Sequence, residues 1–544
     1  MKKNLVILIS LAVFLGAAVT SCKKSFLDEK PFSSYTAATL TDSLGFEAQI
    51  VGLYNHLSTL FTYDGNQGWL CVWQVGTDVA FSTQPVGIET PYYNYASLTP
   101  TDGAASYTWS WCYRMINNCN IIITSIEDPA VNTIGQANKN ATEAEARFFR
   151  GYAYNILATC FGGVPITRQP ISIPRTDFTR ASLDSVNNLV VSDLTYAATY
   201  LPDIESVRTN SKGKMYSRAN KYQAMQLLAE AYLRTGKNDL AEQQTQAIIS
   251  SGRFSLIKTR YGVKAGQAGD PFSDMFWYGN QRRNQGNGEA LWVLEQENPN
   301  SVTGGNTGNA QQRRVWGAAY YQYASTTTGG MIIADSLGGR GVARLRLSNW
   351  VLYGLYPAGD MRNSRYNIRR EFYYNDPGKP NYGKLVTPVA PVDTVFRLMP
   401  HTTKWYQYDP NDVFGYAMIK DLILMRLGET YLLQAEAQMK QGKLTDAAAS
   451  INALRTRANA PMVTAAQMDL NFILDERTRE LIGEENRRMT LMRTGTLVDR
   501  ATRLNSNTVT FPLNGLTSKN LLMPIPQSEI DLNKDARLTQ NPGY

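Results

Sequence analysis

The sequence predicts a mostly α-helical protein built on antiparallel helix hairpins, with one long irregular insertion. Three observations predict this fold class. Apolar residues recur at helical spacing over 142–161 and in two hairpin-like stretches, 218–250 and 421–459. A charged stretch with helical spacing follows at 473–494. Between the two hairpins, residues 251–420 lack helical periodicity and are rich in glycine and tryptophan, which is typical of loops.

The first long helix is expected over residues 142–161. Thr142 and Glu145 have the spacing of an S/T-x-x-E capping box, which predicts that the helix begins at this point. Bulky residues then line one side of the helix. The sequence GGVP at 162–165 predicts its end, because glycine and proline do not continue a helix.

The stretch 218–250 has the residue spacing of a tetratricopeptide-like helix hairpin. Ala229 and Ala241 are small enough to let two helices approach closely. Tyr232 is placed to fill the gap between the helices, and Gly236 marks the turn.

The stretch 421–459 repeats this pattern with a turn at Gly442. Its two apolar stripes consist of Leu424, Leu427, Tyr431 and Ala435, then Ala447, Ile451 and Leu454. The two hairpins are far apart in the sequence and do not form one uninterrupted array of repeats. Two unrelated antiparallel helix pairs are therefore the alternative interpretation.

Residues 473–494 predict a heavily charged helix. Asp475 with Arg479 and Glu484 with Arg488 are acid-first pairs four residues apart, which predict a solvated, stabilised helix face. Acidic pairs also occur in catalytic sites, but the regular alternation of charges favours a structural helix.

The insertion 251–420 holds 21 of the 41 glycines of the chain. Loops and short strands, such as 290–295, fit it better than helices. Long irregular segments in a helical protein usually carry function. Five tryptophans lie in this segment: Trp277, Trp292, Trp316, Trp350 and Trp405.

Composition excludes several classes of function. The net charge is +8, but acidic and basic residues are mixed along the chain, so no basic stripe for nucleic acid is expected. The chain has only two histidines, His56 and His401, so neither a histidine-based triad nor a histidine-rich zinc site is expected.

The cysteines are sparse and form no C-x-x-C motif. A disulfide between Cys112 and Cys119, or between Cys71 and Cys112, is one interpretation. Buried free thiols, including Cys160, are the other.

The N-terminus, residues 1–21, reads as an export signal. Lys2 and Lys3 precede an apolar stretch that is shorter than the approximately 20 residues a membrane-spanning helix needs. The sequence VTSC at 19–22 resembles a bacterial lipobox, in which the peptidase cuts before the cysteine and the thiol carries diacylglycerol. The sequence therefore predicts a mature chain that begins at a lipidated Cys22 and is held firmly by its acyl chains.

Several motifs follow one another in order from end to end of the chain. The chain after residue 21 opens with CKKSFLDEKP at 22–31 and closes with LMPIPQSEIDLN at 522–533 and LTQNPGY at 538–544. Between them lie Glu145–Arg150 with Phe161–Pro165, Asp360–Arg362, Met425–Glu429, Ala435–Ala437, Arg479–Leu481 and Glu484–Arg488. Together these segments resemble the SusD/RagB family, whose opening is C-x-x-F-L-D-x-x-P. This chain has one extra residue in the opening and Met361 in place of the family's usual proline.

This resemblance implies one SusD-like domain over 22–544, an α-α superhelix of tetratricopeptide-like hairpins with a loop-rich part that carries the ligand site. It implies a lipid-anchored protein on the outer face of the outer membrane, which caps a SusC-like TonB-dependent transporter and delivers glycans or, in some members, peptides. No cofactor, covalent chemistry or nucleic-acid partner is expected. Some members hold calcium, but this chain has no EF-hand-type loop.

The aromatic residues of two irregular loops are the predicted ligand site. A sugar is gripped by an aromatic ring on its flat C–H face and by polar groups at its rim. The loops 78–111 and 277–323 combine tyrosine and tryptophan with asparagine and aspartate. Any single ring here is more often a core residue than a ligand platform, but side chains in irregular segments are free to face solvent, and adjacent tyrosines flanked by asparagine are less easily buried. The proposed ligand groups are Asp78, Tyr92, Tyr93, Tyr95, Trp109, Trp277, Tyr278, Trp316, Tyr320 and Tyr321.

Three other functions stay open at this point. The same scaffold could bind peptides, or a tetratricopeptide-like scaffold could bind only proteins. A glycoside hydrolase would need two carboxylates roughly 5–10 Å apart. The resemblance favours a binding protein over an enzyme, and the aromatic loops favour glycans over peptides.

Overall fold

Our computed structural model describes residues 42–62, 66–211, 213–299, 301–302, 305, 310–323, 329–407, 414, 418–505 and 510–544. The expected export signal and Cys22 lie outside these residues. Within the described ranges, no helix is both long enough and apolar enough to cross a membrane. Helices make up most of the regular structure and the strands are short, which confirms the mostly α-helical fold class.

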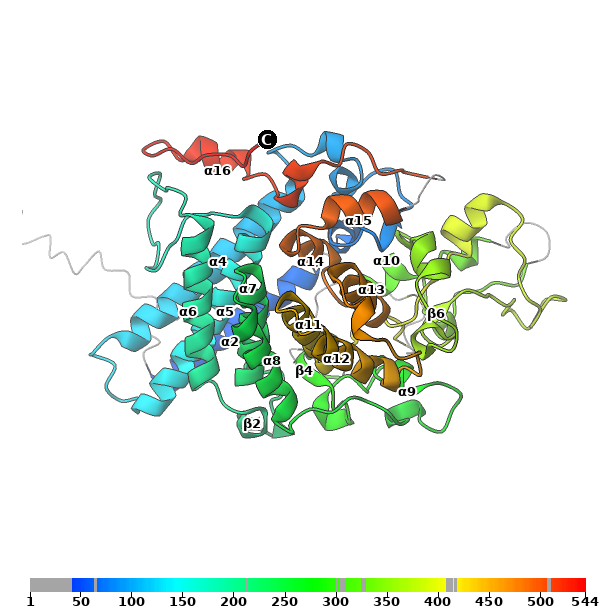
Figure 1. Cartoon of the computed structure of the whole chain (residues 1–544), viewed down its shortest axis with the longest axis horizontal. Coiled ribbons are helices and arrows are strands. Elements are labelled where there is room, and N and C mark those ends of the chain that lie inside the picture. The colour runs from blue at the N-terminus through cyan, green and yellow to red at the C-terminus, as the bar shows by residue number, and fades with distance from the viewer. Residues whose placement is uncertain are drawn as a thin grey trace, which may run out of the picture.

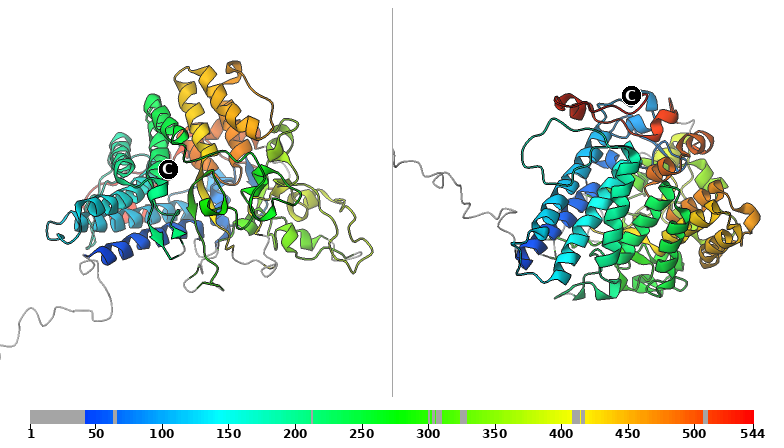
Figure 2. Two further views of the ribbon diagram at one scale, coloured as in Figure 1. Left: turned by 90° about the horizontal axis from the view of Figure 1, so that it is seen from below. Right: turned by 60° about the vertical axis from the view of Figure 1, so that its left-hand side comes forward.

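Antiparallel helices pack side by side into one array (Figures 1 and 2). α2 (Ser43–Thr62) packs on α4 and α5, and α13 (Leu470–Leu481) packs on α11. In order of contact the array runs α4 (Gly103–Glu127), α5 (Gln136–Phe161), α6 (Leu183–Tyr200), α7 (Lys221–Arg234), α8 (Asn238–Ser250), α11 (Leu427–Lys440) and α12 (Leu444–Arg457).

Both predicted hairpins are confirmed, as α7–α8 and α11–α12. They are also neighbours, because α8 packs directly on α11. The interpretation as two unrelated helix pairs is therefore wrong. Ala229 and Ala241 are fully buried and Tyr232 is buried beside them, as close helix approach requires.

The helix predicted at 142–161 is confirmed, but its predicted start is wrong. α5 begins at Gln136, and Thr142 and Glu145 are buried in its interior. Glu145 does not cap the helix. Its carboxylate accepts a hydrogen bond from Arg218 Nη2 at 2.6 Å, so this glutamate joins α5 to the segment before α7.

A strand precedes the second hairpin, where the sequence predicts helix. β8 (Leu422–Arg426) pairs antiparallel with β4 (Ala290–Leu294), with Ile423 opposite Val293. The strand predicted near residue 290 is thus confirmed. Leu424 belongs to this ladder and not to the stripe of α11, because cross-strand pairing to a distant segment overrides the local helical spacing.

The insertion 251–420 forms few regular elements and makes up the right-hand part of Figure 1. Its short helices include α9 (Pro271–Asp274) and α10 (Gln312–Trp316). Two-stranded ribbons cross-link it: β1 (Ala80–Ser82) with β5 (Leu345–Leu347), and β6 (Ile368–Arg369) with β7 (His401–Thr402). A further ribbon, β2 (Thr209–Asn210) with β3 (Gly213–Lys214), lies before α7.

The charged stretch 473–494 is not one solvated helix. α13 ends at Leu481, Gly483 adopts a left-handed φ of +77°, and α14 (Arg487–Arg493) follows. α15 (Leu497–Leu504) and α16 (Gln527–Leu532) complete the chain. The predicted acid-first pairs do not form. Asp475 instead binds Arg500 at 2.6 Å, and Glu484 binds Arg426 at 2.7 Å.

A buried ion network explains this difference. Glu480 of α13 has no exposed side-chain surface and binds three guanidinium groups from three separate segments. Arg426 Nη1 lies 2.5 Å away and Arg362 Nη1 lies 3.0 Å away, and Arg457 is also bonded. Burial raises the pKa of Glu480, but the guanidinium groups around it, Arg457 first, hold that pKa well below its usual value.

Replacing Glu480 with glutamine should lower the free energy of unfolding by about 3–5 kcal/mol, because three buried arginines would lose their shared counter-charge. Denaturant unfolding of the purified protein measures this change. Asp177→Asn, which breaks an exposed pair with Arg175, is the matched control and should leave the unfolding midpoint unchanged.

The pH dependence gives a second readout of the same variant. A carboxyl group with a lowered folded-state pKa stabilises the protein above its ordinary value of 4.5, and this contribution is lost as the pH falls. Wild type should therefore lose more stability below pH 4.5 than Glu480→Gln does. Equal losses in both proteins, or an equal midpoint at neutral pH, would contradict a central role for Glu480.

Candidate functional site

The structure divides the ten proposed ligand groups into a buried and a half-buried set. Trp277, Tyr278 and Tyr321 are half-buried. The others have at most 5% of their surface exposed: Asp78, Tyr92, Tyr93, Tyr95, Trp109, Trp316 and Tyr320. The expectation that the loop side chains face solvent is wrong for these seven. Ligand binding by any of the ten stays a prediction.

Arg488 of α14 holds the first loop in the core. Its guanidinium carbon lies 4.8 Å from the ring centre of Tyr92 and 5.4 Å from that of Tyr95. It also donates hydrogen bonds to the backbone carbonyls of Val75 and Tyr92. The Tyr92 hydroxyl donates to Asp102 Oδ1 at 2.6 Å, and burial raises the pKa of Tyr92 well above its usual value. These rings therefore anchor the loop.

Asp78 is a structural ion-pair partner and not a sugar-rim group in this arrangement. Its carboxylate accepts from Arg487 Nε at 2.8 Å and from Arg500 Nε at 2.7 Å. Burial by itself would raise the pKa of Asp78, but these two guanidinium groups hold it below its usual value. These two ion pairs link the first loop to α14 and α15.

An exposed aromatic residue lies just beyond the ribbon that follows Asp78. β1 pairs with β5, and Ser348 Oγ donates to the Asp78 carbonyl at 2.8 Å. The next turn, Trp350–Gly354, buries Val351 and Leu352. The same turn presents Tyr353 with 69% of its surface exposed, more than any other aromatic residue in the described ranges.

Polar side chains lie on and beside the turn that carries Tyr353. Asn349 is exposed, and its Oδ1 accepts from Arg346 Nη1 at 2.9 Å. Arg346 and Arg370 both interact electrostatically with Tyr353, and Arg370 Nη2 donates to the Leu352 carbonyl at 2.8 Å. We call Tyr353, Asn349, Arg346 and Arg370 the Tyr353 platform. Tyr353 offers an exposed ring for a sugar face and Asn349 an exposed amide for its hydroxyl rim, while Arg346, which is only 5% exposed, holds the Asn349 side chain in place.

The Tyr353 platform is not among the sites predicted from the sequence, where Trp350 stands out only as one of five tryptophans in the glycine-rich insertion. The usable signal was the run Asn349-Trp350 with Tyr353-Gly354 after a short alternating stretch. The adjacent tyrosines at 92–93 and 320–321 were a stronger sequence pattern for a ligand site. However, the adjacency of two rings in the sequence does not show whether they are buried.

The half-buried predicted rings lie in other parts of the insertion. Trp277 and Tyr278 follow α9, next to Phe276, which packs in a small apolar cluster of its own. Lys264 Nζ lies 5.6 Å from the Trp277 ring. Tyr321 packs on a different cluster, where Arg340 Nε donates to its hydroxyl at 3.4 Å. The half-buried rings of the second predicted loop thus lie by two different apolar clusters.

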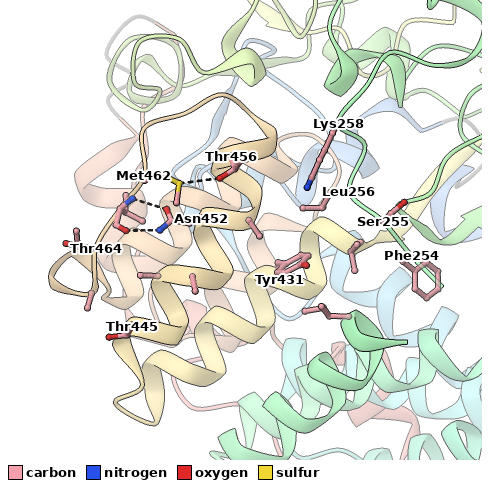
Figure 3. Close-up of a pocket in the computed structure, with 17 residues that line it drawn as sticks. Phe254, Ser255, Leu256, Lys258, Tyr431, Thr445, Asn452, Thr456, Met462 and Thr464 are labelled. Atoms are coloured by element: carbon pink, nitrogen blue, oxygen red, sulfur yellow. Dashed lines mark hydrogen bonds between the residues drawn. The ribbon is translucent and has the colours of Figure 1, made fainter. Parts of the chain in front are cut away.

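A groove of about 980 Å³ runs along the second hairpin (Figure 3). It lies between α11–α12 and the backbone at 254–258 and 462–465. Its floor is rich in small side chains such as Ala449, and Asn452 fixes its rim by two hydrogen bonds to the backbone of Val463. Lys258 is the one charged side chain among the described residues that line it. Apolar side chains make up most of the lining.

The two histidines and the four described cysteines have structural roles. His401 is buried between the Met399 carbonyl and the Tyr406 hydroxyl, and burial lowers the pKa of His401 to about 4. His56 Nε2 lies 3.0 Å from the Trp111 carbonyl oxygen. The disulfide interpretations are wrong, since Cys71, Cys112, Cys119 and Cys160 are buried free thiols. Over the described residues, no group of three or more His, Cys, Asp or Glu is arranged to hold a metal ion.

Comparisons with known proteins agree with this architecture. Residues 358–544 match the model of the SusD family, and residues 25–233 match the model described as "Starch-binding associating with outer membrane". SusD-like protein P25 of Formosa agariphila is 24% identical over 552 residues, 96% of each chain. The starch-binding protein SusD of Bacteroides thetaiotaomicron is 35% identical over 126 residues, which are 23% of this chain and 22% of that protein.

Solved structures show the same fold. A SusD-like protein from Bacteroides fragilis superposes with a TM-score of 0.71 at 17% identity, over 94% of this chain and 99% of that one. A laminarin-binding SusD-like protein superposes with a TM-score of 0.63 at 21% identity, over 92% of this chain and all of that one.

The helical array and its loop-rich insertion define a superhelical protein of the SusD-like class. The ordered terminal motifs, the two family matches and the shared fold identify the family. The chain belongs to the SusD/RagB family.

Proposed function

We propose that this protein is a surface-exposed, lipid-anchored binder that captures an oligosaccharide and passes it to a SusC-like TonB-dependent transporter without cleaving it. The Tyr353 platform carries this proposal, because its ring is exposed and polar groups flank it. The starch- and laminarin-binding relatives support a glycan as the ligand. The chain acts as one domain from Cys22 to its end, after removal of residues 1–21.

The same observations support two alternatives, a peptide-binding protein and a glycoside hydrolase, less well than a glycan-binding protein. A peptide-binding member would use backbone hydrogen-bonding edges, whereas the Tyr353 platform offers a ring face with an exposed amide. A glycoside hydrolase needs a pair of available carboxylates. Asp78 and Glu480, two of the fully buried acids, are each held by two or more arginines, so these two are poorly placed to exchange protons with a substrate.

Tyr353→Ala should weaken oligosaccharide binding by about tenfold to a hundredfold, if stacking on the ring contributes about 1–3 kcal/mol as aromatic platforms do for bases. A glycan array identifies the ligand, and calorimetric titration of the purified full-length protein measures the change. The protein is kept in a detergent without sugar headgroups.

Tyr200→Ala is the matched control, because this tyrosine is 44% exposed and lies at the end of α6 in the helical array. It should bind as tightly as wild type. Equal affinity of the Tyr353 variant and wild type would place the site elsewhere. Shortening of the glycan during the titration would contradict the non-enzyme claim.

Cys22→Ser should release the protein from the outer membrane, because the serine hydroxyl does not replace the thiol that accepts diacylglycerol. Stable anchoring requires more than one acyl chain, and the lipidated cysteine would supply them. Fractionation of cells that express wild type and variant measures the anchor. A variant that stays in the membrane pellet like wild type would refute the lipobox interpretation.

We further propose that the groove along α11–α12 contacts the transporter. Ala449 is exposed on the groove floor, so Ala449→Arg adds bulk and charge without disturbing the core. This variant should lower co-purification of the transporter with the lipoprotein severalfold while glycan affinity stays the same. Ala137→Arg, at an exposed position near the start of α5, is the control. Undiminished co-purification with Ala449→Arg would exclude the groove.

A further inference from the structure

A cavity of about 230 Å³ lies where the helical array meets the insertion. Four indole rings line it, from Trp73, Trp292, Trp316 and Trp405. They belong to segments that are far apart in the sequence, so the tertiary fold brings them together. Trp316 is the one side chain proposed from the sequence as a ligand group that borders this cavity.

Four carboxylates also line the cavity: Glu230, Glu429, Glu484 and Glu485. Although Glu429 lies deep in the protein, 22% of its side-chain surface stays accessible because it borders the cavity, and for Glu230 the fraction is 25%. The cavity therefore presents acceptor oxygens next to ring faces.

Arginines behind the lining bind Glu429, Glu484 and Glu485 closely, and Arg493 Nε lies 3.8 Å from Glu230 Oε1. Arg477 Nη2 donates to Glu429 Oε1 at 2.8 Å and also binds Glu485. Arg426 Nε donates to Glu484 Oε2 at 2.7 Å. None of these arginines is among the described lining residues. The cavity thus offers hydrogen-bond acceptors whose charge is already balanced, which favours hydroxyl donors over a cation.

Two polar side chains at the cavity are set back from its space. Gln312 is only 4% exposed, and its Oε1 accepts no hydrogen bond from the described residues. Likewise, Trp405 Nε1 donates to no described acceptor. Neighbouring protein atoms cover both atoms, so the indole faces and the accessible carboxylates form the contact surface of the cavity.

We propose that this cavity binds one neutral sugar ring, a monosaccharide or a single terminal unit. Its volume of about 230 Å³ is below the roughly 300–1,000 Å³ of pockets for drug-sized ligands. A single pyranose suits a site of this size, with C–H faces for the indoles and hydroxyls for the carboxylates. The site is separate from the Tyr353 platform and does not depend on the platform binding a glycan.

Titration of the full-length protein with glucose, galactose, mannose and xylose tests this proposal, with glucosamine as the charged comparison. Tryptophan fluorescence reports entry, because four indoles line the site, and calorimetry gives the affinity. At least one neutral sugar should bind and change the emission. Glu230→Met, which removes an accessible carboxylate, should weaken its binding by about threefold to tenfold, the range expected for one hydrogen bond.

Leu70→Trp fills the cavity from α3 (Gln67–Val72) and should abolish monosaccharide binding without lowering the melting temperature. Gln136→Met, at an exposed position of α5, is the control and should bind like wild type. The proposal is overturned if no neutral sugar binds, if binding persists in Leu70→Trp, or if glucosamine alone binds. Platform binding of oligosaccharide should survive in Leu70→Trp, so failure here is distinct from failure of the proposed function.

Discussion

The rest of the structure depends on the ion pairs that the buried Glu480 carboxylate forms with three arginines. This carboxylate gathers Arg362, Arg426 and Arg457, which come from the insertion, from β8 and from α12. A buried charge is tolerated only when it is paired, so these segments are fixed relative to α13. The network joins the helical array to the irregular insertion, which has little regular hydrogen bonding to hold it in place.

The same logic extends to the proposed binding surface. Arg487 and Arg500 bind Asp78, and the Arg488 guanidinium lies over the Tyr92 and Tyr95 rings of the first loop. The ribbon β1–β5 follows directly from Asp78, and the turn after β5 presents Tyr353 (chain order shown by colour in Figure 1). Arginines after α13 therefore set the position of an exposed ring more than 130 residues earlier in the chain.

The sequence predicted the elements whose signal is local. The hairpins α7–α8 and α11–α12 follow from small residues and turn glycines at fixed spacing, and β4 from an apolar run. The prediction of one solvated helix over 473–494 was wrong. Four-residue spacing predicts ion pairs within one helix, whereas Glu484 and Asp475 bind arginines from other segments. Tyr92 and Trp316 were predicted to face solvent but are buried, for a related reason. A loop ring is buried or exposed by the chain that packs on it, and adjacency in the sequence does not report that packing.

Hydrogen exchange of the full-length protein, with and without the oligosaccharide that it binds, tests the central claim most directly. We predict that bound glycan slows amide exchange at the ribbon and turn, residues 79–83 and 345–354, while the core of α13 stays equally protected in both states. Slowing confined to the groove at 445–465, with no change in the ribbon and turn, would contradict the account.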